Sequence, residues 1–202
     1  MKGARLLSVS VAIVPAAGKG ERFGASPKLW ADVSGEPLLN RTIISLLEAG
    51  VDRVIVVLAP ERATDRERLT RVAALADPRV EIVTNPDPAR GMFSSIHAGL
   101  HVVGAGDPIL VLPGDMPFVR ATTVAAVIAV CARTGRVVTA RYGDRSGHPV
   151  ALPARLGRDI LAKDASATLS AVLRDIGGPR EFVDVDDAGV VRDVDVMGDL
   201  ES

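Results

Sequence analysis

Short apolar runs alternate with amphipathic segments along the first two thirds of the chain. The run that contains Val14 is rich in small and β-branched residues, which is typical of a buried parallel strand. After Pro37, Leu39, Ile43 and Leu46 recur at helical spacing and predict a helix. The predicted strands lie within residues 6–17 and at 54–58, 80–83, 109–112 and 137–140, and the predicted helices cover residues 37–49, 61–75, 92–103 and 121–132.

The last third of the chain has a less regular pattern. It predicts strands at residues 150–152, 182–185 and 190–194 and a helix at residues 166–173. Repeated strand, helix and strand units indicate one doubly wound, Rossmann-like α/β domain over residues 1–202, with a mostly parallel sheet flanked by helices. Ligands of such sheets bind outside the carboxyl ends of the strands. The segments to inspect therefore follow Val14, Leu58, Val83 and Leu112.

Composition and charge exclude several classes of protein. The 24 basic and 25 acidic residues nearly cancel, so no overall field favours nucleic acid or an anionic membrane. No apolar stretch reaches the ~20 residues of a membrane span. Lys2 and Arg5 could begin a secretory signal, but the apolar run leads into a glycine-rich basic loop, which favours the strand. The single cysteine, Cys131, falls on an apolar helical face, so we expect it in the core and the protein in the cytoplasm.

A glycine-rich basic loop follows the first strand. Glycines let the backbone approach a phosphate chain, and several cations close together attract it, so the loop is suited to a triphosphate. The glycines are Gly18 and Gly20, and the cations are Lys19, Arg22 and Lys28. The alternative is a glycine-rich turn with solvated charges.

Two other phosphate-binding loops do not fit this segment. A P-loop requires a lysine and then serine or threonine after its last glycine, whereas Ala25 follows Gly24 here. A dinucleotide fingerprint opens directly into a helix, but Pro27 interrupts any helix here and the nearest suitable acid, Glu61, comes too late. A dinucleotide-binding oxidoreductase is therefore a weaker hypothesis.

Asp115 directly follows the loop glycine Gly114, after the strand predicted at residues 109–112. A carboxylate in this position faces the same edge of the sheet as the basic loop and is suited to a divalent cation that bridges phosphate oxygens. Asp115 is therefore a predicted metal ligand. The alternative is that it only forms a turn.

Three motifs together resemble the NTP-transferase superfamily of α/β nucleotidyltransferases. They are AAGKGERFG with the later Lys28, LPGDMP around Asp115, and the ending DVDVMGDL. In that superfamily the first motif binds the NTP, the aspartate after the central strand binds magnesium, and a late aspartate is a second ligand. The resemblance therefore implies Mg²⁺ as the cofactor and Asp199 as the second ligand. Asp193 and Asp195 are alternatives, because the family's Thr and Pro are missing there.

Different parts of the chain resemble different enzymes of this superfamily. The opening VPAAGKGERFG resembles methylerythritol phosphate cytidylyltransferase, whereas NPDPARGMFSSIHAGL, LPGDMPFV and GHPVALP are similar to molybdenum cofactor cytidylyltransferases and their relatives. The later segments should lie nearer the acceptor, which favours a molybdopterin-type acceptor. Ala16 and Ala17 match the LAAG form of cytidylyltransferases, where guanylyltransferases have LAGG, and this favours CTP over GTP.

The same resemblance gives roles to two residues outside these motifs. Ser95 would contact the base or ribose, with helix capping near Met92 as the alternative. His148 would lie on the acceptor side and contact the substrate, with a structural role in its turn as the alternative. His97 and His101 have metal-ligand spacing, but no partner glutamate or third ligand accompanies them, so we expect them at the surface.

The sequence thus predicts a magnesium-dependent nucleotidyltransferase that moves CMP from CTP onto a phosphorylated small molecule and releases pyrophosphate. Molybdopterin is the predicted acceptor, and a molybdoenzyme is a candidate partner. The alternatives are a methylerythritol phosphate or sugar-phosphate nucleotidyltransferase, a molybdopterin guanylyltransferase and a nucleotide-binding protein without turnover. The predicted catalytic residues are Arg22, Lys28 and Asp115, and the predicted nucleotide-binding residues are Ala16, Ala17, Gly18, Lys19, Gly20, Arg22, Lys28 and Ser95.

Overall fold

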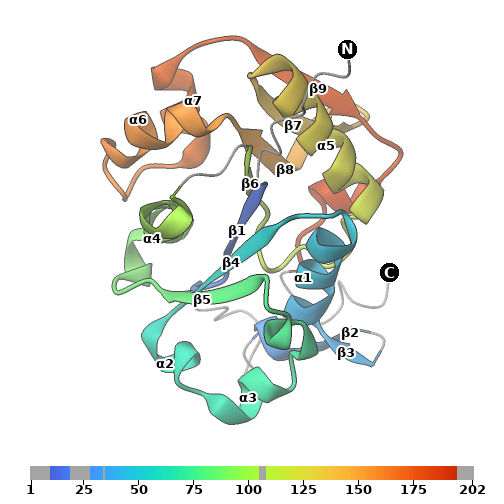
Figure 1. The fold of residues 1–202 in the computed structure, drawn as a ribbon, viewed down its shortest axis with the longest axis vertical. Coiled ribbons are helices and arrows are strands. Elements are labelled where there is room, and N and C mark those ends of the chain that lie inside the picture. The colour runs from blue at the N-terminus through green and yellow to red at the C-terminus, as the bar shows by residue number, and fades with distance from the viewer. Residues whose placement is uncertain (1–9, 19–27, 34, 105–107, 195–202) are drawn as a thin grey trace, which may run out of the picture.

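The computed structural model describes residues 10–18, 28–33, 35–104 and 108–194. Over these residues the chain forms a seven-stranded sheet in the order β5-β4-β1-β6-β8-β7-β9, and a two-stranded sheet of β2 and β3 (Figure 1). The strands are β1 (Val11–Pro15), β2 (Asp32–Val33), β3 (Glu36–Pro37), β4 (Arg53–Leu58), β5 (Val80–Thr84), β6 (Ile109–Val111), β7 (Val137–Tyr142), β8 (Arg145–Leu152) and β9 (Arg180–Asp184).

Parallel pairing dominates the large sheet. The central strand β1 lies between β4 and β6 and is parallel to both, and β5 is parallel to β4. β8 is antiparallel to β6 and β7, and β9 is parallel to β7. The predicted mostly parallel, doubly wound α/β fold is therefore confirmed. Because β8 is antiparallel, it begins at the edge of the sheet where β1 and β6 end.

Helices and short 3₁₀ turns connect the strands. The α-helices are α1 (Leu38–Glu48), α2 (Pro60–Ala63), α3 (Arg66–Thr70), α4 (Met92–Val103), α5 (Ala121–Thr134), α6 (Gly157–Leu161) and α7 (Leu169–Ile176). The 3₁₀ turns are η2 (Lys28–Trp30), η3 (Ala73–Ala76), η4 (Pro88–Arg90), η5 (Ala154–Leu156) and η6 (Ala188–Val191). No helix in the described part of the chain is long and apolar enough to cross a membrane.

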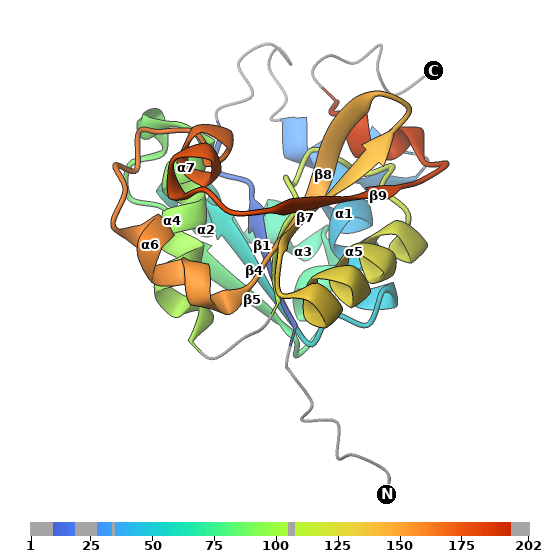
Figure 2. The ribbon, with the colours of Figure 1, turned by 90° about the horizontal axis from the view of Figure 1, so that it is seen from above.

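Helices cover both faces of the sheet, so that the sheet is the middle of three layers (Figure 2). Successive residues of β1 point to opposite faces, as the strand period requires. Ala12 and Val14 pack in a core that includes residues of α1 and α5, whereas Val11 and Ile13 pack in a second core with α4, α6 and α7. The central strand is therefore buried on both faces, as its continuous apolar sequence predicts.

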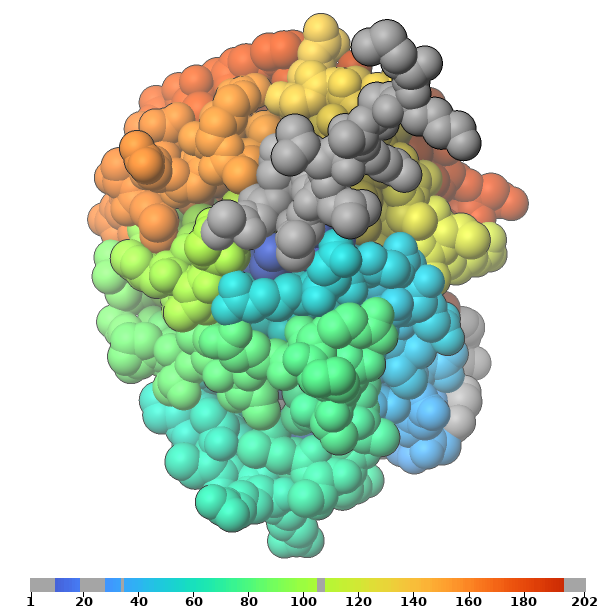
Figure 3. Space-filling view, viewed as in Figure 1, coloured from blue at the N-terminus to red at the C-terminus, as the bar shows by residue number. Residues whose placement is uncertain are grey.

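The helix predicted at residues 61–75 is wrong as a single element. The chain forms α2, α3 and η3 there, at the lower end of the molecule (Figure 3). Asp65 is the cause, because its side chain accepts a hydrogen bond from the backbone N–H of Arg68, 3.1 Å away, and so starts a new helix. The Thr64 hydroxyl also bonds back to the carbonyls of Pro60 and Glu61 at the end of α2.

The strand predicted at residues 190–194 is also wrong. The segment forms η6 and then an extended stretch outside the sheet. The side chain of Asp187 accepts a hydrogen bond from the N–H of Gly189 at 3.1 Å, which bends the chain into the turn. Cys131 is buried in the core, as predicted, and its thiol donates to the carbonyl of Arg136.

Candidate functional site

The loops after β1 and β6 lie side by side at the carboxyl edge of the sheet. The N–H of Gly114 donates to the carbonyl of Pro15 at 3.0 Å, which continues the pairing of the two strands into their loops. A Cβ at Gly114 would lie 3.1 Å from the Cβ of Ala16 and 3.1 Å from Cδ1 of Leu39. Glycine therefore lets the loop that carries Asp115 approach the first loop closely.

Lys28 and Asp115 meet at this edge. The Lys28 Nζ lies 2.8 Å from Oδ2 of Asp115, and the two side chains are 10% and 29% exposed. Lys28 belongs to the buried turn η2, which returns the chain to the edge after the first loop. Two residues that the sequence assigned to one site are thus in direct contact although 87 positions separate them.

His148 lies within the antiparallel strand β8, close enough to Asp115 for the carboxylate charge to act on its ring. Its Nδ1 is 3.2 Å from the carbonyl oxygen of Val111. A carbonyl oxygen can only accept, so Nδ1 carries the proton and Nε2 of the neutral ring is an acceptor. Burial lowers the pKa of His148 below its usual value, although the nearby carboxylates of Asp115 and Asp193 act in the opposite direction. The imidazole is therefore neutral at pH 7.

The late segment returns to Asp115 without forming a strand. The N–H of Val194 donates to the carbonyl oxygen of Asp115 at 3.0 Å. Asp193, the adjacent residue, is exposed and contributes to the electrostatic field at His148. The first two residues of the DVDVMGDL segment therefore lie next to Asp115, although the strand predicted there does not form.

Asp187 fixes the position of this late segment. Its Oδ2 accepts hydrogen bonds from the N–H of Arg120 at 2.9 Å and from the hydroxyl of Thr123 at 2.6 Å, at the start of α5. The side chain is buried, and carboxylates that accept several hydrogen bonds are held firmly. The sequence pattern did not single out Asp187 for this role.

Two glycines allow the late segment to pack against its neighbours. A Cβ at Gly147 would lie 1.7 Å from the carbonyl oxygen of Val190, and a Cβ at Gly189 would lie 2.3 Å from that of Phe118. Such distances are far below van der Waals contact, so only glycine fits at either position. The backbone of residues 189–190 therefore lies directly against the start of β8 and the loop before α5.

Ser95 is buried under the start of α4. It is 2% exposed, and its hydroxyl accepts a hydrogen bond from Nδ2 of Asn85 at 3.1 Å. The same amide donates to the hydroxyl of Ser94, which itself donates to the carbonyl of Gly91. The alternative that Ser95 caps α4 is wrong, because Gly91 occupies the N-cap position and no side chain caps this helix.

Arg62 is a second residue that sequence analysis missed. It lies in α2, directly after β4, and is 8% exposed. Its Nη1 donates to the carbonyl oxygen of Ala16 at 3.2 Å and also to the carbonyl oxygen of Gly18. The predicted nucleotide-binding residues Ala16, Ala17 and Gly18 are thus held from the β4 side of the sheet.

The structure does not describe all of the predicted site residues. Lys19, Gly20, Arg22, Asp195 and Asp199 lie outside the described residues. His101 is exposed, as predicted. His97 is half-buried: its Nε2 lies 3.1 Å from the carbonyl of Ile160, and its ring packs edge-on against Phe93. Within the described part of the chain, no three acidic, histidine or cysteine side chains are grouped as a metal site.

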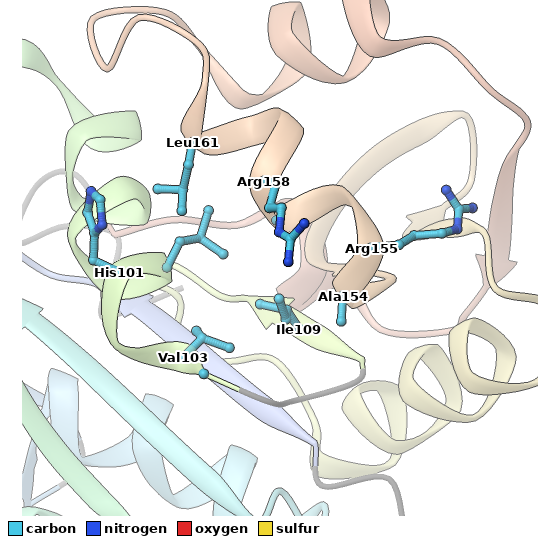
Figure 4. A pocket seen from close by; sticks show the side chains of 10 residues that line it. His101, Val103, Ile109, Ala154, Arg155, Arg158 and Leu161 are labelled. Atoms are coloured by element: carbon cyan, nitrogen blue, oxygen red, sulfur yellow. The ribbon is translucent and has the colours of Figure 1, made fainter.

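A cavity of about 620 Å³ lies between the end of α4 and the start of α6 (Figure 4). Ile109, the first residue of β6, lies in its wall, so the cavity is at the edge of the sheet opposite to Asp115. None of the predicted site residues that the structure describes lies in its wall. Its described lining is Leu100, His101, Val103, Gly104, Ile109, Ala154, Arg155, Gly157, Arg158 and Leu161.

Comparisons with known proteins agree with this arrangement. The model of the MobA-like NTP transferase domain matches residues 12–181. Nicotine blue oxidoreductase of Paenarthrobacter nicotinovorans is 30% identical over 194 residues, which cover 92% of this chain and 91% of that protein. 2-C-methyl-D-erythritol 4-phosphate cytidylyltransferase of Rhodococcus opacus is 34% identical over 121 residues, which cover 59% of this chain and only 50% of that enzyme.

A solved structure shows the same fold over nearly the whole chain. Rv0371c of Mycobacterium tuberculosis, in its complex with manganese, superimposes with a TM-score of 0.73 at 22% identity and covers 96% of this chain and 97% of its own. At that identity the likeness concerns the fold alone. The match to the family model, in contrast, spans most of the chain and includes β1, β6 and the residues around Asp115. The chain therefore belongs to the MobA-like NTP transferases, a family of nucleotidyltransferases.

Proposed function

We propose that this protein transfers CMP from CTP to a phosphorylated small molecule, with molybdopterin as the favoured acceptor, and releases pyrophosphate. The contact between Lys28 and Asp115 carries the proposal. This contact brings together a cation suited to phosphate and a carboxylate suited to a metal at the carboxyl edge of β1 and β6. Ala16 and Ala17 remain the reason to prefer CTP.

In the proposed reaction, an oxygen of the acceptor phosphate attacks the α-phosphorus while the bond to the leaving pyrophosphate breaks. The acceptor needs no general base, because a phosphate is already largely ionised at neutral pH. Lys28 would stabilise the charge that develops on the α-phosphate, so this side chain acts by position and charge. Lys19, Gly20 and Arg22 are proposed to bind the remaining phosphates.

Asp115 is proposed to hold Mg²⁺. The site fits such an ion, because the carboxylate is partly exposed and Asp193 lies in the segment bonded to it through Val194. Mg²⁺ commonly takes one or two protein carboxylates and completes its shell with phosphate oxygens and water. Asp199 is the proposed second ligand, with Asp193 and Asp195 as alternatives. A bound metal ion would neutralise charge on the phosphate oxygens.

His148 and Ser95 have proposed roles on the substrates. The neutral ring of His148, with Nε2 as an acceptor, would accept a hydrogen bond from the acceptor molecule. Ser95 would contribute to the base or ribose site through the start of α4, which Asn85 organises. We further propose a single domain over residues 1–202, a cytoplasmic location and a molybdoenzyme as a partner of this protein.

One observation favours a second candidate function. The relative that aligns along nearly its full length, nicotine blue oxidoreductase, is named for a redox reaction. This protein could accordingly bind a dinucleotide and transfer a hydride on the same fold. Among nucleotidyl transfers, methylerythritol phosphate or a sugar phosphate remains a candidate acceptor, and GTP a candidate donor. A protein that binds the nucleotide without turnover would release no pyrophosphate.

The donor preference can be measured directly. With one acceptor held constant, we expect the kcat/KM for CTP to exceed that for GTP by about tenfold or more, because a donor site commonly separates bases by at least one hydrogen-bonded contact. Pyrophosphate release with each of the four NTPs and a panel of phosphorylated acceptors measures it. A preference for GTP would move the protein to the guanylyl branch, and oxidation of NADH or NADPH without pyrophosphate release would favour the oxidoreductase.

The metal site can be tested with asparagine variants, which keep size and remove charge. Asp115→Asn should raise the magnesium concentration for half-maximal activity by about tenfold, because losing one carboxylate ligand weakens the site. Of the variants Asp193→Asn, Asp195→Asn and Asp199→Asn, only one or two should raise this magnesium concentration. Asp186→Asn, at an exposed acid of the same segment, is the matched control. An unchanged magnesium requirement in Asp115→Asn would exclude this ligand.

A further inference from the structure

The side chain of Arg62 bonds to the loop after β1 at the point where the backbone pairing of β1 with β4 stops. The N–H of Ala16 donates to the carbonyl of Val57 at 2.8 Å, one residue beyond the last residue of β1. β4 ends at Leu58, and the chain then turns into α2, where the N–H groups of Arg62 and Ala63 each donate to Ala59 at 3.0 Å. The guanidinium of Arg62 reaches back from this turn to the carbonyl oxygen of Ala16.

One guanidinium therefore holds two carbonyls of the first loop. Ala16 and Gly18 are two positions apart, so in an extended chain their carbonyls point to the same side, toward β4. A single nitrogen of Arg62, Nη1, donates to both carbonyls, and its two hydrogens are enough for the two bonds. Both carbonyl oxygens therefore face the β4 side of β1, whereas Asp115 follows β6, on the other side of β1.

Arg62 also brings a buried positive charge behind the loop. Burial lowers the pKa of this guanidinium, and the neighbouring Glu61 partly offsets the effect. An arginine still remains protonated at neutral pH, because its usual pKa is far above it. A cation beneath a phosphate-binding loop attracts the negatively charged phosphates. Because Arg62 has low exposure, water screens this attraction less.

We infer that Arg62 is a positioning residue for the polyphosphate of the nucleotide. It acts through the backbone of Ala16 and Gly18, which it holds in place. This inference rests on the proposed function. It concerns the phosphates and not the base, since both bonds are made to the loop after β1. The contribution of Arg62 to binding should therefore grow with the number of phosphates on the nucleotide.

Calorimetric titration of the full chain with CTP and CMP, in magnesium, tests this directly. Arg62→Met keeps the apolar stem and removes the charge and the donors, and we expect it to weaken CTP binding about tenfold or more and CMP binding only about threefold or less. Arg62→Lys keeps the charge without the fork and should fall between wild type and Arg62→Met for CTP.

Arg53→Met is the matched control. Arg53 also donates to a backbone carbonyl, that of Val103, at 3.0 Å, and it lies at the start of β4, the strand that Arg62 follows. Its replacement removes a comparable hydrogen bond away from the loop. We expect CTP binding as in the wild type, even if thermal stability falls. If Arg53→Met is less stable but binds CTP normally, a general loss of stability cannot explain weaker CTP binding by Arg62→Met.

The possible results separate the inference from the proposed function. If wild type binds no nucleoside triphosphate, the proposed function fails before any variant is needed. If wild type binds CTP and both Arg62 variants bind CTP as tightly as wild type does, the inference is overturned and the proposed function stands. Equal losses for CTP and CMP would also overturn it. If Arg62→Met does not fold, Arg62→Lys decides: a loss for CTP but not CMP supports the inference, and wild-type binding of both overturns it.

Discussion

Replacement of Lys28 by methionine is expected to reduce kcat/KM for nucleotidyl transfer by about 10² to 10³ without loss of the fold. Removing one group that stabilises charge in a transition state has effects of this size. Methionine keeps much of the apolar stem of Lys28, whose side chain is only 10% exposed, so the packing of η2 should persist. Pyrophosphate release measures the activity, and thermal unfolding measures the fold.

A second lysine–aspartate pair provides the control. Lys163 and Asp175 form an ion pair at the surface between α6 and α7, far along the chain from the candidate site. Lys163→Met removes the same charge and should leave transfer unchanged, because exposed ion pairs contribute little. Turnover of Lys28→Met at the wild-type rate would mean that this lysine does not act on the phosphate.

Replacement of Gly147 by alanine is expected to lower the free energy of unfolding by about 3 kcal/mol or more, at the upper end of the usual effects of overpacking. The added Cβ would lie 1.7 Å from the carbonyl oxygen of Val190 and 2.5 Å from its carbonyl carbon. Both are backbone atoms, so no side chain can rotate away. Either β8 or the late segment must shift, and the bond from Val194 to Asp115 should be lost with it.

Urea unfolding of Gly147→Ala beside Gly157→Ala tests this prediction. Gly157 begins α6, and a Cβ there would meet no atom within 4 Å. Alanine in a helix is favoured over glycine by about 0.5–1 kcal/mol, so this control should be as stable as the wild type or slightly more stable. If Gly147→Ala unfolded at the wild-type urea concentration, the close contact with Val190 would not exist in solution.

The long periodic elements could be predicted from the sequence with good boundaries. α4 covers the predicted residues, because Gly91 and Gly104 bound it and both have positive φ, at 95° and 64°. The break after α2 could not be predicted from periodicity. Thr64 and Asp65 are compatible with a helix, and only their hydrogen bonds to the backbone decide against it.

The candidate site could be predicted only where its chemistry was also local. Asp115 lies in the loop after a strand, and Lys28 closes a basic loop, so the rule for the carboxyl ends of strands was enough to bring them together. Arg62 acts through contacts to residues 46 and 44 positions away, and Asp187 through contacts to residues 67 and 64 positions away. Arg62 lies in a charged run that resembles a solvated helix, and its role depends on burial, for which the run gives no signal.

The ion pair of Lys28 and Asp115 has a thermodynamic consequence for a nucleotidyltransferase. A metal ion that arrives alone competes with Lys28 for the carboxylate and leaves a lysine that is only 10% exposed with one contact fewer. A triphosphate that arrives alone draws Lys28 away and faces the carboxylate that remains. When both ligands bind together, the metal ion becomes the new partner of Asp115 and the triphosphate becomes the new partner of Lys28. Each ligand then raises the affinity for the other by the same factor, so the pair disfavours partial occupancy of the site.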